Sequence, residues 1–110
     1  MGIRAVLAKP FAAYIASQTK EWSSKPVQFQ DKVFDQLVAS GRQTVFGKDH
    51  GFESIKSYAD FKKQVPIRDY EDLKPYVEKV LHGESNILWK GKPAYFAKTS
   101  GTTSGTKYIP

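Results

Sequence analysis

The chain has 110 residues, of which 40% are hydrophobic and 14% aromatic, and its formal net charge at pH 7 is +6. This length corresponds to at most one domain with a modest core. The chain contains no cysteine, which excludes a disulfide framework and thiolate chemistry, and its two histidines are too far apart in the sequence to suggest a zinc site.

The sequence carries no sign of a membrane span or of a signal peptide. No stretch approaches the roughly 20 apolar residues that a transmembrane helix needs. Arg4 is the one early positive charge, and Lys9-Pro10 interrupts the apolar run around it. We therefore expect a soluble cytoplasmic protein, and the lack of cysteine suits that reducing compartment.

Two amphipathic helices are expected in the first 41 residues. Apolar residues recur at three- and four-residue spacing from Ile3 to Ile15, and Pro10 predicts a kink or a late start. A second helix is expected from Pro26, which suits a first helical position, to Gly41. We expect the apolar faces of both helices to pack into a core.

Two further helices are predicted by their capping residues. Ser57, with Asp60 three residues later, forms a capping box, and Asp69 can cap the next helix with Asp72 at its third position. Asp69, Glu71 and Asp72 invite an acid–base interpretation. Carboxylates in a first helical turn are what the helix dipole favours, so we interpret these three as structural.

The two histidines have different settings. Residues 44–52 are expected to form a loop that presents His50, which is more often structural in such a position but is kept as a weak site candidate. His82 precedes Gly83 at a helix end, where it can interact with the last carbonyl groups of that helix.

Short strands are expected in the last quarter of the chain. Asn86–Trp89 and Ala94–Lys98 have strand character, with the turn Lys90–Pro93 between them. A third short strand is expected at Tyr108-Ile109.

The segment from residue 99 to 107, called here the 99–107 loop, is the most informative part of the chain. Between Lys98 and Lys107 stand six serine or threonine residues and the glycines Gly101 and Gly105. Glycine lets backbone N–H groups turn toward one point, such amides form an anion-binding concavity, and lysine adds a compact positive charge. A phosphate-binding loop is therefore predicted, although a flexible Ser/Gly linker or hairpin has a similar composition.

Charge supports the same interpretation. Residues 85–110 contain Lys90, Lys92, Lys98 and Lys107 and no acidic residue, so four of the six net positive charges lie around the loop. Such a field favours a polyanion such as a nucleotide triphosphate. Solvated lysines at strand edges are the simpler alternative.

The loop resembles the phosphate-binding loop of the adenylate-forming superfamily, whose pattern is roughly Ser/Thr-Ser-Gly-Thr-Thr-Gly-x-Pro-Lys. It is not a Walker loop, because Tyr108 follows its lysine where serine or threonine is required. The departures from the superfamily pattern are the inserted Ser104 and Thr106, which stands where proline is usual. The residues in register are Thr99, Ser100, Gly101, Thr102, Thr103 and Lys107.

These departures are more similar to one branch of the superfamily, the auxin-responsive (Gretchen Hagen) family of acyl-acid–amido synthetases. Upstream motifs carry the same resemblance, which covers nearly the whole chain and is strongest from Thr44 to Pro110. Those motifs are Phe46–Phe52, Val65–Leu73, His82–Glu84 and Leu88-Trp89.

The resemblance implies an α+β fragment of a larger adenylate-forming enzyme fold, in which helices precede a short antiparallel strand–phosphate loop–strand. Residues 1–110 would be the N-terminal portion of the large adenylating domain, with 1–84 mainly helical and 85–110 forming the strands and the loop. The implied cofactor-binding residues are Thr99, Ser100, Gly101, Thr102, Thr103, Ser104, Gly105 and Lys107.

The implied activity belongs to a longer parent, a ligase that uses ATP and Mg²⁺ to adenylate a carboxylic acid and then conjugates it to an amino acid. The resemblance implies no catalytic and no metal-binding residue in this segment, so the fragment alone should be inactive. Because apolar helix faces would then lack most of their sheet, the isolated chain is expected to be marginally stable or to self-associate.

Two other functional classes remain open from the sequence. One is a stand-alone phosphate- or nucleotide-binding module. The other is a basic nucleic-acid-binding domain in which lysines interleave with Tyr95, Phe96 and Tyr108 to stack bases, although no recognisable RNA or DNA motif supports it.

Overall fold

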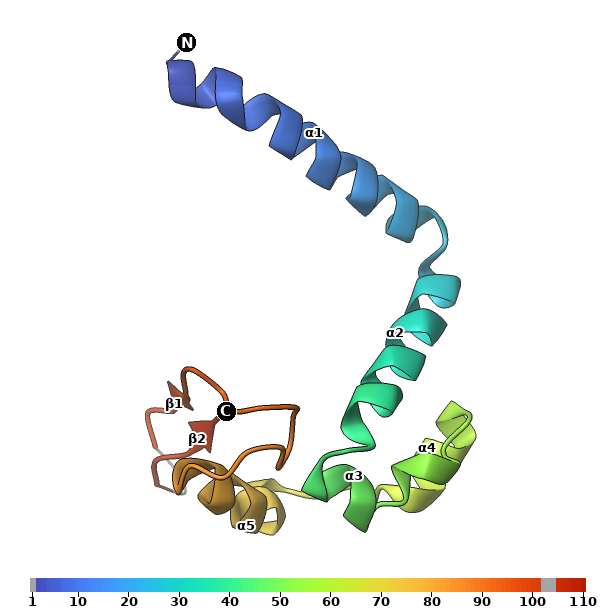
Figure 1. The fold of residues 1–110 in the computed structure, drawn as a ribbon, viewed down its shortest axis with the longest axis vertical. Helices are drawn as coiled ribbons and strands as arrows, with labels where there is room; N and C mark the ends of the chain where they lie inside the picture. The colour runs from blue at the N-terminus through green and yellow to red at the C-terminus, as the bar shows by residue number, and fades with distance from the viewer. Residues whose placement is uncertain (1, 102–104) are drawn as a thin grey trace. The chain divides into compact units, whose positions relative to one another are not determined.

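The computed structural model describes residues 2–101 and 105–110, and it divides into two compact units, residues 1–33 and 34–110. Each unit is described by itself below. Figure 1 shows the order of the elements along the chain. They are α1 (Ile3–Ser24), α2 (Pro26–Gly41), α3 (Val45–Asp49), the 3₁₀ helix η1 (Phe52–Ser54), α4 (Tyr58–Gln64), α5 (Tyr70–Leu81), β1 (Ala97–Lys98) and β2 (Tyr108–Ile109).

The first helix is longer than expected and contributes no core. α1 runs without a break through Pro10 and extends to Ser24, although only Lys20 and Glu21 among the polar residues after Gln18 are strong helix formers. No residue of α1 is buried, and Ile3 and Leu7 are 77% and 73% exposed. The expected core packing of this helix is therefore wrong within its own unit, where no partner surface covers its apolar side chains.

α2 begins at Pro26 and ends at Gly41, as predicted. Its C-terminal half lies in the second unit, where Val38 is buried. The core cluster of that unit consists of Val38, Phe52 and Ile55, with Phe34, Phe46, Phe61 and Val65 packed around it. Gly41 is required at the end of α2, because a Cβ atom there would lie 2.7 Å from the Phe52 ring.

The short helix α3 covers residues 45–49 and is followed by a turn at His50-Gly51, so the loop expected over residues 44–52 is wrong where α3 forms. The buried Thr44 caps α3 by accepting a hydrogen bond from the Gly47 amide at 2.9 Å. The first two helical amides, of Val45 and Phe46, donate to the carbonyl groups of Asn86 and Ile87 at 2.8 and 3.0 Å. A contact this distant in sequence satisfies the free N-terminal amides and allows a helix of five residues.

The predicted caps of α4 and α5 are confirmed. The Ser57 hydroxyl accepts from the Asp60 amide at 3.2 Å, and the Asp69 carboxylate accepts from the Asp72 amide at 3.0 Å. The hydrogen bond from the Ser57 hydroxyl, with a second from the Lys56 amide, lowers the pKa of the Asp60 carboxyl. At the other end of α5, His82 Nδ1 lies 2.7 Å from the Glu78 carbonyl oxygen, as expected for a histidine in a last turn.

The first predicted strand, Asn86–Trp89, is wrong. Asn86 adopts a left-handed conformation with φ of 58°, which no extended strand allows. Its amide donates to the Gly91 carbonyl at 2.8 Å, and its side-chain oxygen accepts from the Gly91 amide at 2.7 Å. Asparagine tolerates this conformation and ties the segment into a tight loop.

The two remaining strands form a small antiparallel sheet in which Ala97 pairs with Ile109 and Lys98 with Tyr108. The second predicted strand is shorter than expected, since pairing covers only Ala97–Lys98. The described residues are thus mostly helical with one two-stranded sheet, which agrees with an α+β fragment. No helix in the described ranges is long and apolar enough to cross a membrane.

Candidate functional site

The 99–107 loop is closed at its base by two hydrogen bonds. The Thr99 amide donates to the Lys107 carbonyl at 3.0 Å, and the Lys107 amide donates to the Thr99 hydroxyl at 3.0 Å. The hydroxyl thus replaces the main-chain acceptor that would continue the strand ladder. Pairing ends at Thr99, and the described residues on either side, Ser100-Gly101 and Gly105-Thr106, lie outside the sheet.

Two glycines shape the described part of the loop. Gly101 and Gly105 have φ of 70° and 80°, in the left-handed region where side chains are disfavoured. A Cβ atom at Gly101 would lie 2.9 Å from Gly105 C and from Thr106 N. The two sides of the loop therefore approach each other so closely at Gly101 that only glycine fits without a shift of the backbone.

The return strand of the loop, β2, is attached to α5 by Tyr70, the first residue of that helix. The Tyr108 amide donates to the Tyr70 hydroxyl at 3.0 Å, and the same hydroxyl is 3.3 Å from the Tyr108 carbonyl oxygen, to which it can donate. The Lys107 ammonium group lies over the Tyr70 ring, 5.4 Å from its centroid. These contacts hold the lysine end of the loop on the N-terminal turn of α5.

The structure brings together only some of the predicted site residues. Thr99, Gly101, Gly105 and Lys107 meet as described above, and the exposed Ser100 lies between Thr99 and Gly101. Thr102, Thr103 and Ser104 lie outside the described residues. Over the described ranges, no three histidine or acidic side chains gather as metal ligands would.

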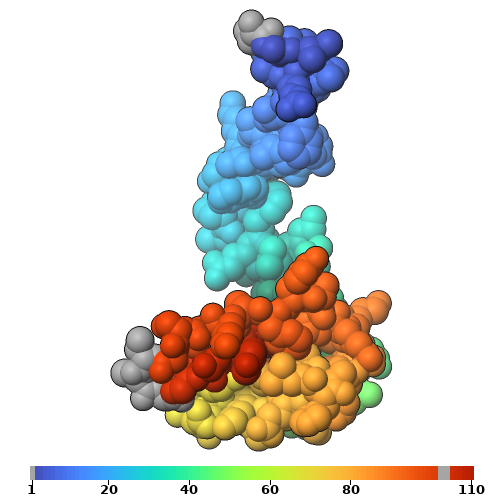
Figure 2. Space-filling view, turned by 90° about the vertical axis from the view of Figure 1, so that its left-hand side faces the viewer, coloured from blue at the N-terminus to red at the C-terminus, as the bar shows by residue number. Residues whose placement is uncertain are grey.

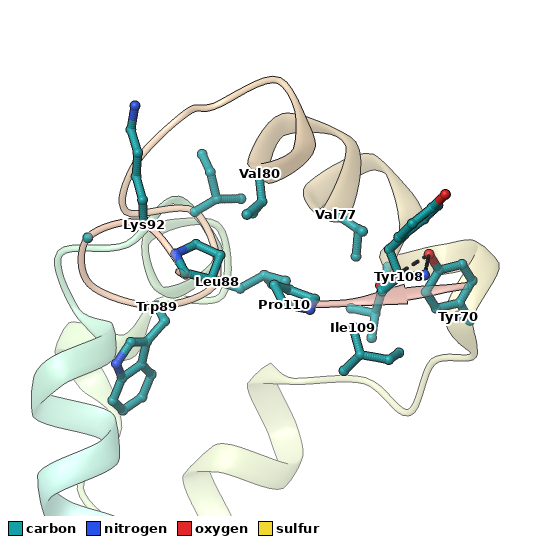
Figure 3. A pocket seen from close by; sticks show the side chains of 13 residues that line it. Tyr70, Val77, Val80, Leu88, Trp89, Lys92, Tyr108, Ile109 and Pro110 are labelled. Carbon is teal, nitrogen blue, oxygen red and sulfur yellow. Dashed lines mark hydrogen bonds between the residues drawn. The ribbon is translucent and has the colours of Figure 1, made fainter. Parts of the chain in front are cut away.

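An apolar cavity of about 470 Å³ lies beside the loop, between α5, β2 and residues 87–93. In Figure 2 the C-terminal segment, orange to red, lies over α5, which is drawn in yellow to gold. Figure 3 shows Val77 and Val80 reaching the cavity from α5, with Tyr70 and Tyr108 at one end and Trp89 at the other. The sequence alone did not predict this cavity, since its lining comes from segments far apart in the chain.

His50 is buried rather than presented on a loop, and its contacts are those of a structural histidine. It is 6% exposed and stacks on Phe46 with ring centroids 4.0 Å apart, and its Nδ1 lies 2.7 Å from the Phe46 carbonyl oxygen. Its Nε2 finds no hydrogen-bond partner among the described residues. Nearby, burial raises the pKa of the Tyr76 hydroxyl, and the hydrogen bond that it donates to Asp49 at 2.8 Å raises it further.

Comparison with known proteins places the chain in a family. Residues 15–110 match the GH3 family N-terminal domain, so the chain belongs to the GH3 family, which is the auxin-responsive family that its motifs resembled. No solved structure matches it significantly.

The curated relatives are amido synthetases and ligases that are much longer than the segment they share with this chain. Indole-3-acetic acid-amido synthetase GH3.2 of Arabidopsis thaliana is 27% identical over 91 residues, which cover 82% of this chain and 17% of that protein. The 4-substituted benzoates-glutamate ligase GH3.12 of the same plant is 30% identical over 82% of this chain and 16% of its own length. A rice relative, probable indole-3-acetic acid-amido synthetase GH3.13, is 45% identical over 47 residues, which are 43% of this chain and 10% of its own.

Proposed function

We propose that the chain is the phosphate-binding N-terminal part of an ATP-dependent acyl-acid–amido synthetase. In this activity an oxygen of a carboxylic acid attacks the α-phosphorus of ATP, pyrophosphate leaves, and the amine of an amino acid then displaces AMP from the acyl carbon. The relatives support the ligase class by their names. The adenylation step, with ATP and Mg²⁺, is our extension of that class to this chain.

The observation that carries the proposal is the closed base and narrow turn of the 99–107 loop. Thr99 and Lys107 fix the two ends, and the left-handed Gly101 and Gly105 direct the chain between them. Backbone amides in such turns bind anions, and charge stabilisation is the main requirement of phosphoryl transfer. Lys107 supplies a positive charge at the loop, and residues 85–110 contain no acidic side chain to oppose it.

The chain by itself is proposed to be inactive. Its described residues contribute a loop for phosphates, and we place the acyl pocket, the contacts to adenine and ribose, and the catalytic lysine of the lid in the rest of the longer parent. The magnesium ion would accompany the triphosphate, because the 99–107 loop has no carboxylate to bind it.

Pyrophosphate exchange against ATP concentration tests the proposal in the full-length synthetase that carries this segment. Lys107→Ala should raise the apparent KM for ATP in this exchange about ten- to a hundredfold, since hydrogen bonds to a charged group are worth roughly 1.5–3 kcal/mol. Gly101→Val should be worse, because it adds a Cβ atom 2.9 Å from the opposite backbone at a φ of 70°. Lys90→Ala, an exposed lysine of the same acid-free segment, is the matched control and should be close to wild type.

Normal exchange in both loop variants would refute the proposal and leave the loop as a hairpin connection. A salt-dependent affinity of the chain for single-stranded oligonucleotides, with no effect of ATP, would instead favour the nucleic-acid alternative.

A further inference from the structure

One edge of β2 faces away from its partner strand β1. Thr99 and Lys107 face each other one step beyond the Lys98–Tyr108 pair, and they make a main-chain hydrogen bond. Hydrogen-bonded and non-hydrogen-bonded pairs alternate along an antiparallel ladder, so Lys98 and Tyr108 are a non-hydrogen-bonded pair. The amide and carbonyl groups of Tyr108 therefore face away from β1.

One hydroxyl group occupies this edge. Tyr70 Oη accepts from the Tyr108 amide at 3.0 Å and can donate to the Tyr108 carbonyl at 3.3 Å, as the dashed lines in Figure 3 show. A tyrosine hydroxyl is both donor and acceptor, so it can satisfy both main-chain groups of one edge residue. Phenylalanine in its place would leave both groups without that partner.

The ring of the same residue contacts the loop's lysine. Lys107 Nζ lies 5.4 Å from the Tyr70 ring centroid, within the range of a cation–π contact. Tyr70 is also the first residue of α5, and the Asp69 carboxylate caps that helix by accepting from the Asp72 amide. The capped first turn of α5 therefore contacts both the backbone after Lys107 and the ammonium group of Lys107 itself.

We propose that Tyr70 is a positioning residue for nucleotide binding, which holds Lys107 and the return strand of the 99–107 loop in place for the phosphates. This inference rests on the proposed function. The hydroxyl fixes the Tyr108 backbone and the ring holds the ammonium group, so the two roles can be separated by substitution. Tyr70→Phe removes the hydroxyl and keeps the ring, and Tyr70→Leu removes both.

Steady-state kinetics of the full-length synthetase separate these roles. Tyr70→Phe should raise KM for ATP about two- to tenfold, the range for loss of a neutral hydrogen bond. Tyr70→Leu should raise it about two- to fivefold more, the range for an exposed cation–π contact. kcat and KM for the carboxylic acid should stay close to wild type, because Tyr70 supports ATP binding alike in the ground state and the transition state.

Hydrogen exchange gives a readout that does not depend on catalysis. The Tyr108 amide should exchange faster in Tyr70→Phe than in wild type, measured on the peptide that covers residues 105–110. Tyr76→Phe is the matched control, because it removes a hydroxyl from the same helix that bonds to Asp49 and not to the loop. It should leave both the exchange of this peptide and KM for ATP unchanged.

The outcomes distinguish this inference from the proposed function. If Lys107→Ala and Gly101→Val raise KM for ATP but both Tyr70 variants behave as wild type, the inference about Tyr70 fails alone. If KM for ATP is normal in all four variants, both proposals fail. A rise confined to KM for the carboxylic acid would overturn the inference as well, since it would assign Tyr70 to the neighbouring apolar cavity.

Discussion

Thr99 has a defined role at the scale of a single residue. By the resemblance, Ser100, Thr102 and Thr103 are the hydroxyl residues expected to contact phosphates, whereas Thr99 is expected to shape the loop. In the structure the Thr99 hydroxyl accepts from the Lys107 amide and closes the base of the loop. We therefore interpret Thr99 as the residue that ends strand pairing and fixes the backbone position of Lys107.

The prediction for Thr99 compares two substitutions. Thr99→Val keeps the shape of the side chain and removes the acceptor, so the Lys107 amide loses its partner. KM for ATP in the full-length synthetase should rise about two- to tenfold, because a hydrogen bond of this kind is worth roughly 0.5–1.5 kcal/mol. Thr99→Ser retains a hydroxyl at the same place and should be close to wild type. Equal KM values for the two variants would show that the base of the loop closes without this bond.

At the scale of elements, Asp69 carries the sharpest prediction. Its carboxylate caps α5, so Asp69→Ala should lower the free energy of unfolding by about 1 kcal/mol. Asp69→Asn should retain most of that stability, since an amide oxygen also accepts from the Asp72 amide. Denaturant titration of the full-length synthetase and its two variants measures both effects. Should Asp69→Asn abolish adenylation while the protein stays folded, the structural interpretation of this carboxylate would be wrong.

The sequence predicted the elements whose signals are local. Pro26 and Gly41 bound α2, Ser57 caps α4, and Asp69 caps α5, each through a residue type that acts within one turn. It also placed the hairpin, since the pairing of Lys98 with Tyr108 agrees with a strand–loop–strand segment.

The elements that the sequence did not predict depend on distant contacts. α3 is completed by the carbonyl groups of Asn86 and Ile87, about 40 residues further along the chain. In turn, the left-handed Asn86 and its bonds to Gly91 prevent the strand that the apolar run after it suggested. The attachment of Tyr108 to Tyr70 likewise joins residues that no local pattern connects.

At the scale of the whole molecule, the apolar side chains of α1 lack a partner within their unit. Phe11 is 68% exposed, as Ile3 and Leu7 also largely are, although the three recur at helical spacing. The family match begins at residue 15, so these three residues precede it. Periodicity predicted which face of α1 is apolar but carries no information on what covers that face.

The last prediction is that the isolated 110-residue chain self-associates through α1. Contiguous exposed apolar surface favours association in water, and burial of such side chains offsets the marginal stability of a small core. In sedimentation velocity, the apparent mass of the wild-type chain should rise with concentration, and the double substitution Leu7→Lys with Phe11→Lys should suppress that rise. Ser23→Lys adds a charge on the opposite side of the same helix without removing an apolar side chain, so it should associate as wild type does. A wild-type chain that stays a monodisperse monomer at all concentrations and unfolds in one sharp two-state transition would contradict this prediction, and the exposed residues of α1 would then need no partner.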